Sequence, residues 1–222
     1  MESKLTTSQS LNKRYRVNFT IGRKIEKADD KLLPTQSYLL RPRHNNSRVV
    51  TIKAGGLNTV SAAAVLSPRG LTPLVMQTAD CIPAIAFTPP GQFLALLHLG
   101  WQGLFSPLLD NFFAAAAREN IKPHELQFIF GPSICRDCYT HHSPLQLAKW
   151  WRLRLSRFNQ FTHYDKSRTF DLTGAWQAAL ASHDIAGQRI TSVGLCTHHD
   201  LNTSFHYQGQ TSSKVTTIIT TN

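Results

Sequence analysis

The stretch TADCIPAIAFTPPGQFLALLHLGWQG, residues 78–103, lies at the centre of the predicted fold. Two apolar runs, 82–87 and 92–97, flank residues 88–91, whose sequence TPPG is typical of a turn. Apolar runs of this length separated by turn residues predict a β-hairpin. The hairpin would carry the motifs TADC and HLGWQG at its open end.

The open end of this hairpin brings a thiol and an imidazole together. A turn centred between Pro89 and Pro90 places Cys81 opposite His98. Cross-strand partners have Cβ atoms about 4.5–5.5 Å apart, which suits a shared metal or a reactive Cys–His pair. A slipped register is the alternative, because a Pro-Pro turn does not match the tight two-residue hairpin types and Pro83 cannot donate to the ladder.

Outward from the hairpin, the chain alternates strand-like and helix-like segments. Strands are predicted at 15–21, 37–41, 48–53, 57–66, 71–78, 126–130, 190–195 and 215–220, and helices at 108–118, 144–158 and 174–183. Many strands with few helices predict an α+β fold, a single layered domain with mixed β-sheets and a few packed helices. Residues 1–12 are expected to be a flexible tail, and residues 13–222 the domain.

Several motifs resemble one bacterial family in order and spacing, over roughly residues 36 to 222. They are TADC (78–81), HLGWQG (98–103), GPSICRDCY (131–139), FDLTGAWQAAL (170–180), LCTHHD (195–200) and SFHYQGQ (204–210). The family carries two names, multicopper polyphenol oxidase (laccase-like) and zinc-dependent purine nucleoside phosphorylase. The resemblance implies the same layered α+β fold.

The resemblance also implies a metal site at Cys81, His98 and His44. His44 lies in a turn-rich tetrapeptide where the family has a histidine ligand, although its neighbours do not match, and a histidine in a loop is more often a surface residue. Three protein ligands leave a fourth position for water or substrate, as in catalytic zinc sites. Zinc is the expected cofactor, with copper possible.

The implied substrates are a purine nucleoside and phosphate. Phosphate would attack C1′ and release the free base and ribose 1-phosphate, so the enzyme is a glycosyltransferase with possible deaminase or oxidoreductase activity. Asp80, beside the cysteine, is expected to orient a histidine or to act as a general acid or base. Together Asp80, Cys81 and His98 form the predicted catalytic set.

Four residues are predicted to bind substrate. Trp101 would form one wall of a purine-binding pocket or pack in the core, and Cys138 matches a family cysteine that lines the pocket. Gln102 stands where the family has an arginine, so a phosphate-binding guanidinium is missing. Arg43 is the fourth, and the cations expected to substitute for the arginine are Arg43, Arg48 and Lys214.

A second metal candidate competes with the first. Residues 135–138 form a CxxC motif followed by His141 and His142, and residues 196–199 read CTHH. Such thiolates and imidazoles bind zinc in structural sites, although ordered ligand pairs are usual there and one pair here is irregular. The alternative is that Cys138 lines the pocket and Cys135 is an extra.

Two functions need no metal. Cys81 facing His98 is also the nucleophile–base arrangement of a cysteine hydrolase. A basic binding protein with a decayed active site is the other alternative, suggested by Gln102 and by the altered context of His44.

The composition limits the partners. Of the formal charge of +11, most lies in residues 1–53, with 12 Lys and Arg against 4 Asp and Glu, which attracts phosphates and nucleotides. Nucleic acid is an unlikely partner, because no zinc-finger spacing or comparable motif is present. No apolar stretch approaches the ~20 residues of a membrane span, and a signal peptide is not evident. We expect a cytoplasmic monomer or homodimer whose four cysteines serve as ligands or thiols.

Overall fold

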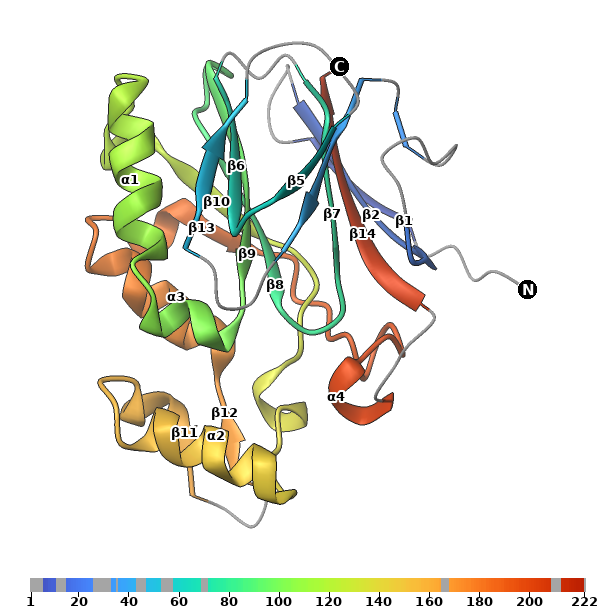
Figure 1. The fold of residues 1–222 in the computed structure, drawn as a ribbon, viewed down its shortest axis with the longest axis vertical. Helices are drawn as coiled ribbons and strands as arrows, with labels where there is room; N and C mark the ends of the chain where they lie inside the picture. The colour runs from blue at the N-terminus through green and yellow to red at the C-terminus, as the bar shows by residue number, and fades with distance from the viewer. Residues whose placement is uncertain are drawn as a thin grey trace.

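The computed structural model describes residues 6–10, 15–25, 33–34, 36–42, 47–52, 58–68, 72–164, 168–208 and 213–221. These residues form two β-sheets that pack face to face, and helices cover the outer face of the second sheet (Figure 1). The fold is a single layered α+β domain with mixed sheets, which confirms the predicted fold class.

The first sheet has six strands in the order β1-β2-β14-β7-β3-β5. They are β1 (Thr6–Ser10), β2 (Tyr15–Arg23), β14 (Ser213–Thr221), β7 (Leu74–Thr78), β3 (Tyr38–Arg41) and β5 (Asn58–Ser61). β3 runs parallel to both β5 and β7, whereas the other pairs are antiparallel. The three parallel strands therefore end at the same edge, at Arg41, Ser61 and Thr78.

The second sheet also has six strands, in the order β13-β10-β8-β9-β6-β4. They are β13 (Ile190–Ser192), β10 (Gln127–Phe130), β8 (Ile82–Phe87), β9 (Phe93–Leu99), β6 (Ala64–Pro68) and β4 (Val49–Thr51). A small pair, β11 (Thr162–His163) and β12 (Thr169–Phe170), lies apart from both sheets.

The predicted hairpin is β8 and β9 at the centre of the second sheet, and every residue of both strands is buried. Leu97 and Leu99 pack among the helices, whereas Leu94 and Leu96 pack against the first sheet. Because both faces are covered, the strands are continuous apolar runs and do not alternate with polar residues. His98 shares its face with Leu96 and so points toward the first sheet.

The predicted register of the hairpin is wrong by two residues. His98 pairs with Pro83, and Cys81 lies beyond the paired residues. The cause is a longer turn: the Thr88 hydroxyl accepts hydrogen bonds from the backbone N–H groups of Gln92 and Phe93, each at 3.1 Å. A two-residue shift keeps every side chain on its face, so Cys81 and His98 still share one side of the sheet.

The helices are α1 (Leu108–Arg118), α2 (Pro144–Arg154), α3 (Leu172–Ala181) and α4 (Phe205–Gln208). α1 matches its predicted range. α2 ends four residues before its predicted end. α3 begins two residues before its predicted start, after Asp171, whose carboxylate caps it by accepting from the Gly174 N–H at 2.9 Å. Among the described residues, no helix combines the length and the apolar character that a membrane crossing requires.

The single strand predicted at 57–66 is two strands in different sheets. β5 ends at Ser61 and β6 begins at Ala64, so the chain crosses from the first sheet to the second at Ala62 and Ala63, which are both buried. Small side chains allow this close passage between the sheets. Within the segment predicted to be a tail, Thr6–Ser10 forms β1 by pairing with β2, a long-range contact that composition does not reveal.

Candidate active site

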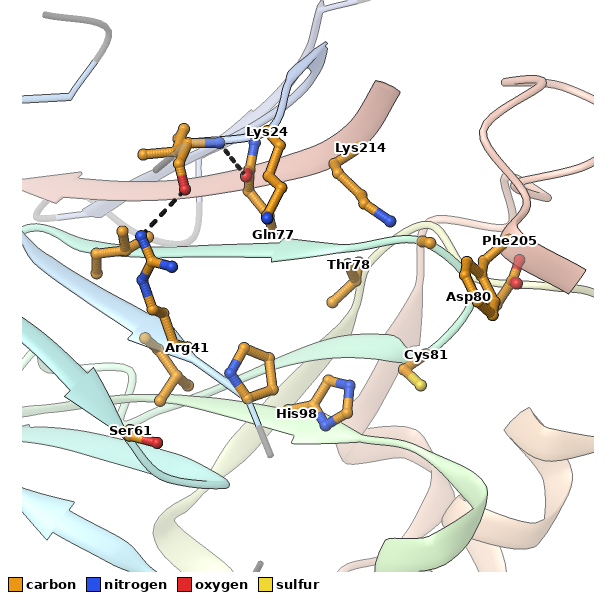
Figure 2. Close-up of a pocket in the computed structure, with 15 residues that line it drawn as sticks. Lys24, Arg41, Ser61, Gln77, Thr78, Asp80, Cys81, His98, Phe205 and Lys214 are labelled. Carbon is orange, nitrogen blue, oxygen red and sulfur yellow. Dashed lines mark hydrogen bonds between the residues drawn. The ribbon is translucent and has the colours of Figure 1, made fainter. Parts of the chain in front are cut away.

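A cavity of about 630 Å³ lies at the edge where the three parallel strands end (Figure 2). Arg41, Ser61 and Thr78, the last residues of β3, β5 and β7, all line it. Cys81 and His98 line it from the open end of the central hairpin. The other lining residues are Lys24, Ile25, Leu39, Leu40, Pro42, Gln77, Ala79, Asp80, Phe205 and Lys214.

The cavity extends around the end of β7. Thr78 and Leu40 belong to the face of the first sheet that meets the second sheet, whereas Leu39 packs on the opposite face with Ile25. Lys24 and Lys214 approach from that outer side (Figure 2). One cavity therefore joins the thiol and imidazole at one end to two ammonium groups at the other.

The Cys81 thiol and the His98 imidazole converge beside Gly100. A Cβ atom placed on Gly100 would lie 2.9 Å from Cys81 Sγ and 3.4 Å from His98 Cε1. The hairpin therefore brings the two side chains together, as predicted. Residue 100 is a glycine because a side chain there would collide with the Cys81 thiol. A thiolate and an imidazole are donors that zinc prefers, so this pair fits the metal that the resemblance implies.

The electrostatics of Cys81 differ from those of a cysteine nucleophile. Burial, and then the charge of Asp80, raise the pKa of Cys81 to about 12, while Lys149 acts in the opposite direction. Catalytic cysteines are activated by a lowered pKa. The environment of Cys81 therefore disfavours the metal-free hydrolase.

Asp80 holds two loops to the hairpin. Its carboxylate accepts hydrogen bonds from the Thr197 hydroxyl at 2.8 Å and from the His206 backbone N–H at 2.7 Å. Its own carbonyl accepts from the Ile134 N–H at 3.0 Å. Both carboxylate oxygens thus have partners, which makes Asp80 a support for the loops around Cys81; its expected role in proton transfer stays a prediction.

Lys149 lies close enough to the site for its charge to act on Cys81, which the sequence did not indicate. Its ammonium lies 4.0 Å from the Tyr139 ring centroid and 5.2 Å from that of Trp101, and it donates to the Tyr139 hydroxyl. Burial lowers the pKa of Lys149 to about 8, against the opposing effects of Cys81 and Asp80. Its spacing of four residues from the buried Leu153 was the signal that this position faces inward.

A group of aromatic rings surrounds Tyr139. His141 and His206 have ring centroids 5.0 and 5.3 Å from it, and the Nε2 atom of each is buried without a hydrogen-bond partner among the described residues. Burial, with the nearby Lys149, lowers the pKa of His141 to about 3 and also lowers that of His206. Both imidazoles are therefore neutral near pH 7.

The remaining predicted residues are dispersed. Trp101 packs edge-on against Phe105 at 6.3 Å, and neither it nor Gln102 is among the residues that line the cavity. Cys138 is buried away from the cavity, with Cys135, Cys196 and His199. Arg43 and His44 lie outside the described residues, so their predicted roles stay predictions.

Cysteine and histidine from two loops form a separate cluster. The ligand atoms of Cys135, Cys138, Cys196 and His199 all lie within 4.8 Å of one another. Of the histidines named beside these cysteines in the sequence, His199 joins the cluster, whereas His141 lies beside Tyr139. Within the described part of the chain, donors suited to a metal ion thus lie together at Cys81 and His98 and again in this cluster.

Known proteins resemble this chain in sequence and in fold. A family model described as multi-copper polyphenol oxidoreductase laccase matches residues 21–221. The purine nucleoside phosphorylase of Haemophilus influenzae is 32% identical over 105 residues, which are 46% of this chain and 40% of the relative. Adenosine deaminase RL5, from an unknown prokaryotic organism, is 26% identical over 115 residues, 50% of this chain and 43% of the relative. The matched part therefore spans less than half of either relative.

Solved structures share the fold along nearly the whole chain. YlmD from Geobacillus stearothermophilus aligns with a TM-score of 0.75 at 14% identity, and the Neisseria meningitidis protein NMB0706 with 0.71 at 20%. Each alignment covers 99% of both chains. Since the family model covers nearly the whole chain and the folds agree, the chain belongs to the multi-copper polyphenol oxidoreductase laccase family.

Proposed function

We propose that the chain is a zinc-dependent phosphorylase of purine nucleosides such as adenosine and inosine. The observation that carries this proposal is the cavity, in which Cys81 and His98 lie at one end and Lys24 and Lys214 at the other. Its volume of about 630 Å³ is within the usual range for small-molecule sites, about 300–1,000 Å³. The names of the curated relatives support this choice of substrate.

Cys81 and His98 would hold the zinc ion, and His44 is the proposed third ligand. When bound, zinc supplies a Lewis acid and lowers the pKa of bound water toward ~7. Asp80 keeps the loops of Thr197 and His206 in place beside Cys81. The chain's own contribution is therefore a preorganised cavity that fixes the nucleoside relative to phosphate.

The phosphate would bind at the end with the two lysines. Burial lowers the pKa of Lys214. The charge of Asp80 raises this pKa, whereas repulsion from Lys24 lowers it further. A bound dianion would relieve this repulsion, because both ammonium groups attract it. In the reaction, an oxygen of hydrogen phosphate bonds to C1′ as the C1′–N9 bond breaks, and the departing base takes up the proton that the hydrogen phosphate gives up.

The purine is proposed to stack on Phe205. This ring lines the cavity and is 52% exposed, and the Lys214 ammonium lies 5.6 Å from its centroid. Aromatic rings supply a large flat surface for a base at little entropic cost. Phe205 therefore takes the role first suggested for Trp101, which packs against Phe105.

The direct test is an assay with inosine and adenosine in the presence and absence of inorganic phosphate. We expect free base and ribose 1-phosphate in equal amounts, formed only with phosphate and lost when zinc is removed by a chelator. Release of base and free ribose without phosphate would instead identify a hydrolase. Absence of base release from zinc-loaded protein with both nucleosides would refute the proposal.

Gly100→Ala is expected to lower kcat/KM by on the order of tenfold or more. The new Cβ would lie 2.9 Å from Cys81 Sγ, so the thiol must move, and a displacement of 1 Å at a catalytic group costs about 100-fold. Gly187→Ala is the matched control, because nothing lies within 4 Å of the Cβ position there. Equal activity of the two variants would show that Cys81 tolerates displacement.

Lys214→Ala is expected to raise the KM for phosphate about 10- to 100-fold. A hydrogen bond to a charged group contributes about 1.5–3 kcal/mol, and Lys214 is one of two ammonium groups in the cavity lining. The KM for inosine should change little. Lys122→Ala, at an exposed position outside the cavity lining, is the control. An unchanged KM for phosphate in Lys214→Ala would show that phosphate binds to other residues.

A further inference from the structure

We propose that Cys135, Cys138, Cys196 and His199 bind a structural zinc ion, distinct from the metal site of the cavity. Their ligand atoms all lie within 4.8 Å of one another. Zn–S bonds of about 2.3 Å in a tetrahedral site place sulfur ligands roughly 3.8 Å apart, so the four donors need to contract by at most about 1 Å. Three thiolates with one imidazole are a recognised structural zinc set.

The side chains of the cluster are in mutual contact. Cys138 Sγ lies 3.0 Å from His199 Nε2, and Cys135 Sγ lies 3.8 Å from His199 Nδ1. The backbone N–H groups of Cys135 and His198 both donate to Cys196 Sγ at 3.4 Å. Such N–H···S bonds stabilise sulfur that carries negative charge, which a metal-bound thiolate does.

The cluster joins two loops that have little regular structure. Cys135 and Cys138 follow β10, and Cys196 and His199 follow β13. An isolated bridge between Ser133 and Cys196 links the two loops just before the cluster. A metal ion with two ligands on one loop and two on the other would fix them together, and its binding energy would become folding energy.

The same loops support the residue next to Cys81. Ile134, adjacent to Cys135, donates its N–H to the Asp80 carbonyl at 3.0 Å, and Thr197, adjacent to Cys196, donates to the Asp80 carboxylate at 2.8 Å. Asp80 precedes Cys81 in the chain. The proposed zinc ion would thus fix Ile134 and Thr197, which in turn hold Asp80 beside Cys81. The ion itself would not touch the substrate. Four protein donors leave no open position, which is typical of a structural site.

The two metal sites are distinguishable by stoichiometry. Protein purified without a histidine tag is analysed for zinc as wild type, Cys81→Ala and Cys138→Ser/Cys196→Ser. We expect two zinc ions in the wild type and one in each variant. Zinc that is unchanged in Cys138→Ser/Cys196→Ser would overturn the proposal, whereas loss of zinc from Cys81→Ala tests only the cavity site.

A measurement on chains with an intact cluster covers the case in which the double variant does not fold. Co²⁺ is added to metal-free wild type and to metal-free Cys81→Ala, and the thiolate-to-cobalt charge-transfer absorption is recorded. Three thiolates should give a strong band in both proteins, and one equivalent of zinc should bleach it in Cys81→Ala. A missing band in Cys81→Ala, binding of copper(I) with no zinc, or formation of a disulfide among the three cysteines in zinc-loaded protein would each contradict a structural zinc site.

Discussion

Replacing Cys81 by alanine is expected to remove nucleoside phosphorolysis and one zinc ion per chain. The thiol and His98 lie against the same point beside Gly100, and among the described residues that line the cavity Cys81 alone carries a sulfur atom. Loss of a residue that merely supports a metal ligand costs about 10- to 100-fold, so loss of a ligand should exceed 100-fold. Metal analysis and kcat/KM for inosine, measured on the same preparation, check this.

The accessibility of the thiol provides an independent control. Iodoacetamide should label Cys81 slowly in zinc-loaded wild type and faster after a chelator is added, since a metal-bound thiolate is protected. Rapid labelling of zinc-loaded protein would instead favour the metal-free Cys–His hydrolase. Unchanged zinc and activity in Cys81→Ala would place the catalytic metal elsewhere.

Leu97→Ala is expected to destabilise the protein by about 2–5 kcal/mol, which corresponds to a fall in Tm of roughly 5–15 °C for a chain of this size. Leu97 is fully buried on the helix-facing side of β9, where its removal leaves a cavity between the layers. His98, its neighbour, faces the opposite way. Well below the Tm, Leu97→Ala should therefore keep its zinc and its kcat/KM.

Leu145→Ala is the matched control for this change, because Leu145 is 85% exposed at the start of α2. Its Tm should move by less than about 2 °C, since surface substitutions lie within about ±0.5 kcal/mol. Thermal unfolding followed by circular dichroism measures both variants. Equal Tm values for the two would argue against the layered core.

The sequence predicts the elements of the fold better than their pairing. The hairpin strands and α1 follow from apolar runs and turn residues, which are local signals. The register depends on the Thr88 side chain inside the turn, and the crossing at Ala62 and Ala63 depends on which sheet each strand joins. Both are set by tertiary contacts, which a local pattern does not contain.

The same distinction applies to the site. Cys81 and His98 were predictable because one hairpin carries both. Lys149 acts on Cys81 through its charge from a distant helix, and Phe205 lines the cavity from near the end of the chain. The cysteine cluster likewise combines loops about sixty residues apart, and sequence spacing suggested its members without showing that they converge.

The crossings of the chain between the two sheets limit how the cavity opens. The backbone passes from the first sheet to the second at Ala62 and Ala63, directly after the cavity residue Ser61, and again at residues 79–81, which line the cavity. These covalent ties oppose any hinge-like separation of the sheets at this edge. Substrate entry should therefore rely on rotation of flexible side chains such as Lys24, Lys214 and Phe205, which occurs in picoseconds to nanoseconds for exposed groups. The opening of the cavity by these side chains would then be too fast to limit turnover.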